Sequence, residues 1–309
     1  MKELFRIIAG TIPYNLFFKL LLSPSFTHAL LDYSQSMDFL GGSSRVWSVE
    51  NLFQSTLSQV VVVPGGKLRV ITQALCDLID KYEPVWRQTH PTHPNIAYVV
   101  GGIPDITTRL QGNGWGPRYE EVVMDTEVGT TLDYMNAELR SSEKLLKEKG
   151  VVPIFATVAT MDIETWNKHR MTKRKTSCLL YKDSYCNMQM DLNEAIFGVN
   201  DIIRQINTEN DVKGPEFSRY VMTPREGCTD RETKFKIRTG PAKFTDGCHP
   251  SPSLSAEWSF HITSVQQENR SKISTLNSVG AVHVPSRLSV WPDIHKYANH
   301  SLTLVRRRR

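Results

Sequence analysis

The sequence has few cysteines, no long uninterrupted apolar run and only a small excess of charge. Its five cysteines are an odd number and form no C-x-x-C pair, so neither a disulfide framework nor a zinc knuckle is indicated. This use of cysteine favours a reducing compartment, and we expect an intracellular location, cytoplasmic or nuclear. The 40% hydrophobic and 22% charged content is typical of a soluble globular protein with a core of normal size.

Residues 5–22 are the only candidate for membrane contact, and they are not apolar enough to span a bilayer. Arg6, Pro13 and Lys19 interrupt the segment, well short of the ~20 apolar residues that a spanning helix needs. The segment also lacks the small-residue cleavage site that follows the apolar part of a secretion signal. We expect a helix that packs on the domain, with a membrane-surface anchor as the alternative.

The net charge of +5 is distributed unevenly along the chain. Two basic runs, residues 168–175 and 306–309, hold much of the excess. Such runs contact nucleic acid or act as nuclear address signals, and the alternative is a solvated loop and a frayed tail. If the first run contacts nucleic acid, its candidate contacts are Lys173, Arg174 and Lys175.

From residue 58 onward, short β-branched runs alternate with amphipathic helical segments. The spacing predicts strands over residues 59–63, 95–100 and 151–159, and helices over residues 67–83, 130–149 and 191–207. The first of these helices is expected to end before Pro84. Because strands and helices alternate, the chain is expected to form a three-layer α/β/α sandwich with a mostly parallel sheet and right-handed crossovers.

The α/β pattern also predicts a division of the chain into three parts. Residues 1–28 form a helical extension, residues 29–265 form the α/β domain, and residues 266–309 form a C-terminal extension that ends in the basic tail. The last boundary is set where the alternation of strands and helices stops, at about Gln266.

The stretch KFTDGCHPSP, residues 243–252, spaces a carboxylate and an imidazole as D-x-x-H across a turn that contains glycine. In such a turn Asp246 can fix the tautomer of His249, and the imidazole can then move protons. The alternative is an aspartate-capped turn in which the histidine is bonded locally. A pair of this kind is half of a catalytic triad, so a nucleophile and oxyanion donors are expected elsewhere.

In a parallel sheet, active-site groups collect on the loops at the carboxyl ends of the strands. The Pro-Gly-Gly turn after the strand at 59–63, the Gly-Gly after the strand at 95–100 and the D-x-x-H turn are expected to share that edge. A short apolar segment within residues 28–42 is followed by Ser34 and Ser36. Ser34 is the first candidate nucleophile and Ser36 the second, with a helix N-cap serine as the structural alternative.

Four stretches in chain order resemble the SGNH/GDSL family of serine esterases and lipases, especially the divergent esterase-like domains encoded by mobile elements and some viruses. They are LLDYSQSM, VVVVPGGKL, YVVGGIPDI and DGCHPS, which stand where the family has G-D-S, the second glycine block, G-x-N-D and D-x-x-H. The resemblance covers about residues 29–258, and the last block is the most specific.

The resemblance implies a nucleophilic attack by Ser34 on the acyl carbonyl of a small-molecule or lipid ester, with His249 as the base and Asp246 as its orienting partner. It also implies that the backbone amide of Gly65 or Gly66, together with Gly102, contributes to the oxyanion and substrate site. It implies neither a metal nor an organic cofactor.

Two departures from the family pattern fall in these blocks. The G-D-S block has Asp32 and Tyr33 before Ser34, and the asparagine of the G-x-N-D block is Pro104, which has no donor. Losing one oxyanion donor lowers the rate about 10²- to 10³-fold in a comparable site. The alternative function is therefore a catalytically inactive SGNH-like domain used for binding or assembly in a virus or mobile element, contacting nucleic acid through the basic runs.

Overall fold

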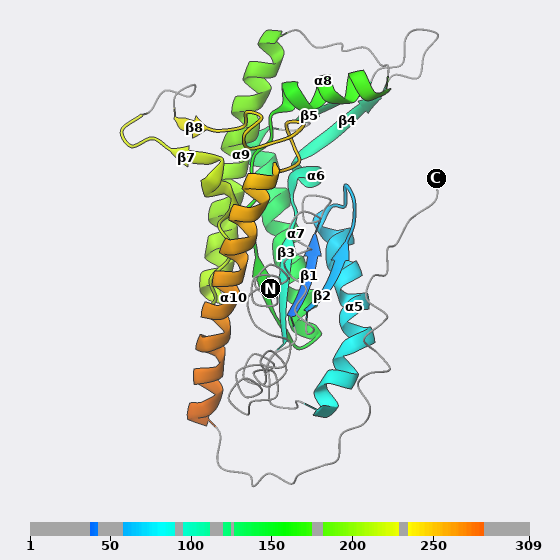
Figure 1. The fold of residues 1–309 in the computed structure, drawn as a ribbon, viewed down its shortest axis with the longest axis vertical. Helices are drawn as coiled ribbons and strands as arrows, with labels where there is room; N and C mark the ends of the chain where they lie inside the picture. Colours follow the sequence, from blue (N-terminus) through cyan, green and yellow to red (C-terminus); the bar gives the residue numbers. More distant parts are fainter. Residues whose placement is uncertain are drawn as a thin grey trace, which may run out of the picture.

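The computed structural model describes residues 38–42, 58–89, 95–111, 120–124, 127–174, 182–228 and 234–280, shown as coloured elements in Figure 1. Its centre is a sheet of four parallel strands in the order β2-β1-β3-β6: β1 (Asp38–Gly42), β2 (Ser58–Val62), β3 (Asn95–Val100) and β6 (Val151–Phe155). The expectation of an α/β fold with a parallel sheet is therefore confirmed. All four strands point toward the same end of the molecule (Figure 1).

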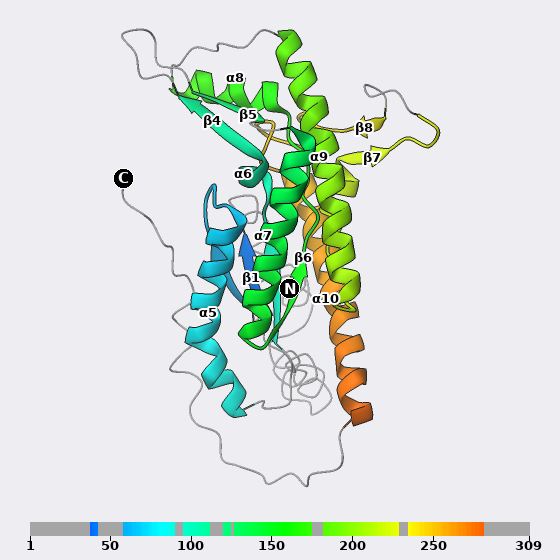
Figure 2. The same ribbon diagram turned by 180° about the vertical axis from the view of Figure 1, so that it is seen from behind.

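The sheet is buried on both faces because successive side chains of a strand point in opposite directions. Phe39 and Val99 belong to one apolar cluster, together with residues from three helices: α5 (Leu68–Thr89), α7 (Val128–Glu148) and α9 (Lys182–Glu209). Leu40 and Tyr98 belong to a second cluster, with Trp258 of α10 (Pro252–Gly280). Figure 1 shows α10 in front of the sheet, and Figure 2 shows α5 and α7 in front of its other face, which gives the three layers expected.

Glycines at the ends of two strands let α5 approach the sheet closely. A Cβ atom built on Gly41 would lie 2.4 Å from Leu75 Cγ, and one built on Gly101 would lie 2.8 Å from Ile71 Cδ1. Both distances are too short for real side chains. The glycines that end β1 and follow β3 are therefore required by helix packing.

Three predicted boundaries were wrong, one of them because α9 begins at Lys182 and not at residue 191. Helix α5 continues through Pro84 to Thr89, because Leu75 and Ile79 on its inner face are fully buried and this burial outweighs the loss of one helical hydrogen bond at an exposed proline. The strand expected over residues 151–159 ends at Phe155. Residues 156–161 remain buried, and this segment bonds to side chains and loops, as described below.

Several elements had no clear sequence signal. They are α6 (Ile103–Ile106), the antiparallel pair β4 (Thr107–Gln111) and β5 (Glu120–Met124), α8 (Ile163–Arg174), the 3₁₀ turn η2 (Phe217–Tyr220), and the antiparallel pair β7 (Met222–Pro224) and β8 (Phe235–Ile237). Helix α10 crosses residue 265, where we expected the α/β domain to end. The division into domains stays a prediction, and residues 1–37 and 281–309 lie outside the described part.

Within the described residues, no helix is both long and apolar enough to cross a membrane. The candidate segment at residues 5–22 lies outside them.

Candidate active site

The D-x-x-H turn brings the carboxylate and the imidazole into direct contact. His249 Nδ1 lies 2.6 Å from Asp246 Oδ2, and the His249 backbone N–H donates to Asp246 Oδ1 at 2.7 Å. A third donor, the backbone N–H of Cys248, reaches the same oxygen at 3.0 Å. Because the carboxylate accepts at Nδ1, that nitrogen carries the proton in the neutral ring, which leaves Nε2 as the basic nitrogen.

These hydrogen bonds keep Asp246 charged. Burial raises the pKa of the Asp246 carboxyl, but the hydrogen bonds from the His249 side chain, the His249 amide and the Cys248 amide together outweigh it and lower the pKa to about 2. The Asp246 side chain is 12% exposed and that of His249 is 36% exposed. The pair therefore combines a fixed, charged carboxylate with an imidazole that solvent or a substrate can reach.

The turn is held against the start of α8 by a glycine. Asp162 N–H donates to the Gly247 carbonyl at 2.8 Å, and the Asp162 side chain caps α8 through Thr165 N–H at 2.8 Å. Gly247 has a φ of 88°, and a Cβ atom there would lie 2.7 Å from the backbone nitrogen of Trp166. Only glycine fits this position, because both the backbone angle and the contact exclude a side chain.

An aromatic side chain from α8 packs beside the imidazole. The Trp166 ring meets His249 edge to face with ring centroids 5.4 Å apart, and His169 stacks on Trp166 at 6.3 Å. The guanidinium of Arg170 lies 5.6 Å from the centre of the Trp166 ring. Helix α8 therefore supplies one wall beside the acid–base pair.

The segment that leads from β6 to α8 is fixed by amide side chains on α9. Asn207 and Asn200 each bond to both the N–H and the carbonyl of one residue, Phe155 and Val158 respectively, at 2.7 to 3.0 Å. Two turns nearer the start of α9, Asn193 accepts from the Thr160 hydroxyl at 2.7 Å. This row of side chains was not predicted, although three asparagines spaced seven apart on the apolar face of a helix are a signal that could have revealed it.

In the turn after β2, the backbone amides of the two expected oxyanion glycines, Gly65 and Gly66, are not equally available. The Gly66 N–H donates to the Val63 carbonyl at 2.9 Å across the Pro-Gly turn. Gly65 takes the left-handed backbone conformation of such a turn, with a φ of 64°. The amide of Gly66 is thus used within the turn, and the Gly65 amide is the better candidate donor.

The turn after β3 contacts the turn after β2 through Asp105. Gly102 begins α6 with a φ of 116°, and its carbonyl accepts from the N–H of Asp105 at 3.0 Å. The Asp105 carboxylate then accepts from the Leu68 N–H, the first residue of α5, at 2.9 Å. Pro104 lies in the first turn of α6, so the position of the family's asparagine has no side-chain donor.

The candidate nucleophiles Ser34 and Ser36 lie outside the described residues. The described strand β1 begins after both of them, at Asp38, and the two residues that follow its last residue in the sequence are Ser43 and Ser44. The sequence analysis missed this strand because Gly41 and Gly42 make it a poor match to a β-branched run.

The basic run lies partly on α8. Lys173 is exposed near the end of the helix, and Lys168 pairs with Glu164 at 2.6 Å. Arg174 is the last residue of α8, its side chain outside the described part, and Lys175 lies outside it entirely. Nucleic-acid contact through these residues stays a prediction.

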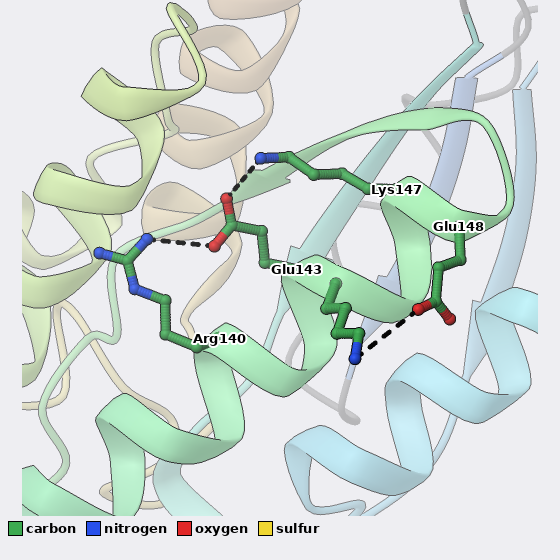
Figure 3. Close-up of a pocket in the computed structure, with 5 residues that line it drawn as sticks. Arg140, Glu143, Lys147 and Glu148 are labelled. Carbon is green, nitrogen blue, oxygen red and sulfur yellow. Dashed lines mark hydrogen bonds and ion pairs between the residues drawn. The ribbon is translucent and has the colours of Figure 1, made fainter.

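A surface hollow of about 420 Å³ on α7 has a different character (Figure 3). Burial raises the pKa of Glu143 there, but hydrogen bonds from Lys147 and Arg140 outweigh it and lower the pKa. Because α7 ends at Glu148, just before β6 begins, the hollow lies near the amino end of β6, away from His249. Its charged groups pair with one another, which indicates a structural ion network.

Among the described residues, no group of three or more histidine, cysteine, aspartate or glutamate side chains could hold a metal ion.

Neither a family model nor a curated protein matches the sequence. Three solved bacterial structures are similar at low identity. One is a protein from Bacteroides fragilis assigned as an acylhydrolase, with 13% identity, a TM-score of 0.44, and coverage of 77% of this chain and 88% of that one. A GDSL-like lipase from Bacteroides thetaiotaomicron has 11% identity, a TM-score of 0.43, and coverage of 80% and 96%. A lipolytic protein of the G-D-S-L family from Desulfitobacterium hafniense has 11% identity, a TM-score of 0.38, and coverage of 75% and 99%.

Proposed function

We propose that the protein is a serine hydrolase of the SGNH/GDSL type that cleaves carboxylic esters. The observation that carries the proposal is the 2.6 Å contact between His249 Nδ1 and Asp246 Oδ2, in a turn anchored to the segment that follows the carboxyl end of β6. In a parallel α/β sheet this is the edge where catalytic groups gather. Among the sequence blocks that resemble the family, the D-x-x-H block, whose two residues are in contact, supports the same function.

In the proposed reaction, His249 Nε2 accepts the proton of a serine hydroxyl as its oxygen attacks the ester carbonyl. The imidazolium that forms is stabilised by Asp246, which stays charged because of its three hydrogen bonds. The imidazolium then protonates the leaving alkoxide, and water hydrolyses the acyl-enzyme by the same steps. The Gly65 amide is the proposed backbone donor to the oxyanion.

The topology favours a serine that follows β1 over Ser34. The five residues of β1 span about 13 Å, and the four residue steps from Ser34 to Asp38 reach at most about 14 Å. Ser34 would reach the carboxyl edge only by a fully extended path back along the strand. Gly42, the last residue of β1, and the Ser43-Ser44 that follow it repeat the glycine and the serine of G-D-S, so we propose Ser44 as the nucleophile, with Ser34 and then Ser36 as the alternatives.

A binding function without catalysis is the second candidate, because Pro104 leaves the side-chain oxyanion donor absent. In that function the D-x-x-H turn is a structural cap, and the basic run on α8 contacts nucleic acid. Affinity for nucleic acid would then fall steeply with salt.

The deciding experiment is labelling with a fluorophosphonate, followed by mass spectrometry to locate the adduct. We expect an adduct on Ser44 that is lost in Ser44→Ala and slowed at least 100-fold in His249→Ala, while Ser34→Ala labels like the wild type. An adduct on Ser34 would transfer the nucleophile's role to that residue. A folded chain that takes no label, and binds nucleic acid in a salt-dependent way, would support the second candidate.

A further inference from the structure

The side chain of Asp105 is partly buried, and one of its two carboxylate oxygens accepts from a backbone amide. Its Oδ2 accepts from the Leu68 N–H at 2.9 Å, whereas Oδ1 is buried without a hydrogen-bond partner among the described residues. Burial, which is the largest effect, raises the pKa of Asp105 to about 6; the bond from Leu68, the charge of Lys67 and the nearby Tyr134 hydroxyl act in the opposite direction. Burying a carboxylate in this way lowers the stability of the fold, so its contacts need an explanation beyond packing.

The contact of Asp105 joins two turns that are distant in sequence. Leu68 begins α5 two residues after the Pro-Gly turn, and Asp105 belongs to α6, whose first turn begins at Gly102. The hydrogen bond spans 37 residues and is made by the backbone amide at the N-terminus of α5, where a negative charge is favoured. The turn after β2 and the turn after β3 therefore share one anchoring contact.

We propose that Asp105 is a positioning residue that fixes the turn after β3 against the turn after β2, and so sets the geometry of the Gly65 and Gly102 backbone at the candidate oxyanion site. This inference rests on the proposed hydrolase function. The need for such an anchor follows from Pro104: without a side-chain donor, stabilisation of the oxyanion depends on backbone amides, and these are only as well placed as the turns that carry them.

The test compares three variants of the full chain. Asp105→Ala removes the acceptor, Asp105→Asn keeps a neutral acceptor of the same shape, and Asp133→Ala changes an exposed aspartate on α7 as a control. Removing a buried charge is not expected to unfold the chain, so the alanine variant remains interpretable. Two readouts are measured: the rate constant of fluorophosphonate labelling, and amide hydrogen exchange of residues 63–71 and 101–106.

We expect labelling to slow at least 10-fold in Asp105→Ala, with the rate restored in Asp105→Asn and unchanged in Asp133→Ala. We also expect the Gly66 and Leu68 amides to exchange faster in the alanine variant only. Faster exchange at Leu68 with unchanged exchange at Gly66, or labelling that is unaffected by Asp105→Ala, would overturn the proposal. If the wild type takes no label the proposed hydrolase function fails, whereas hydrogen exchange still reports whether the two turns are coupled.

Discussion

Replacing Asp105 by asparagine should remove a large part of the pH dependence of stability. The pKa of the Asp105 carboxyl is raised from 3.8 to about 6 in the folded chain, mainly by burial. A shift of about two pKa units corresponds to about 3 kcal/mol between the two protonation states. Because the folded chain disfavours the charged form, Asp105 lowers stability progressively as the pH rises from about 4 to about 6.

Other groups near Asp105 do not reverse this direction. Lys67 and the Tyr134 hydroxyl lower its pKa, and Glu138 raises it. The pKa of Tyr134 is itself raised, first by burial and then by the Asp105 charge, so it does not ionise in the range of interest. The direction of the Asp105 shift is therefore set by its burial.

The assay is urea unfolding of the wild type and of Asp105→Asn at pH 4.0, 5.0, 6.0 and 7.5, followed by tryptophan fluorescence. All other titrating groups are common to both chains, so the difference in unfolding free energy isolates Asp105. We expect the asparagine variant to be close to the wild type near pH 4 and about 3 kcal/mol more stable at pH 7.5, with half of the rise complete near pH 5. A difference that stays constant with pH would refute the argument, and Asp133→Asn, on the surface of α7, should show no rise.

Two further substitutions test what holds the candidate site in place. Gly247→Ala should lower stability by about 1–3 kcal/mol and abolish labelling, because the new Cβ meets the Trp166 backbone; Gly227→Ala, at a similar positive φ without a described atom within 4 Å, should lower stability by only about 1 kcal/mol. Urea unfolding of the two variants separates the effect of the Trp166 contact from that of the backbone angle. Equal losses of stability in Gly247→Ala and Gly227→Ala would contradict a role for the contact. Asn200→Ala should destabilise by about 2–6 kcal/mol because it leaves the N–H and carbonyl of Val158 unpaired, whereas Gln205→Ala on the exposed face should change stability by less than about 0.5 kcal/mol. Thermal unfolding checks the pair, and a small effect of Asn200→Ala would contradict this account of the segment after β6.

The sequence predicted the parallel strands β2, β3 and β6 and the helices between them because each is a continuous apolar pattern. It could not predict that α5 continues through Pro84 or that residues 156–162 leave the sheet, since both depend on partners distant in the chain. The bonds that hold Val158 come from Asn200, 42 residues away. Strand β1 was missed for a related reason: Gly41 is required by Leu75 of α5, and a glycine chosen for close packing weakens the strand signal.

The candidate site shows the same division between local and distant contacts. Asp246 and His249 are three residues apart, so the D-x-x-H spacing was enough to predict that they meet. Asp105 and Leu68 are 37 residues apart, so no local spacing predicts their contact. The pKa of Asp105 is raised, whereas that of the other aspartate, Asp246, is lowered. Asp246 accepts three hydrogen bonds, which outweigh burial, whereas at Asp105 the bond from Leu68 and the smaller contribution of the Tyr134 hydroxyl do not outweigh it.

The division between local and distant contacts also helps to place the nucleophile of the proposed hydrolase. A serine hydrolase needs its nucleophile, its base and its oxyanion donors at one point, and in this fold only the base and its carboxylate come from one local turn. The proposed donors lie on turns after β2 and β3, so the serine is best supplied by the residues that follow β1, since β1 pairs with both strands. Register fixes this relation, because Gly42 lies beside Val62 on one side and Val100 on the other. For the proposed hydrolase, this argument favours a nucleophile among the residues directly after Gly42 over one before Asp38.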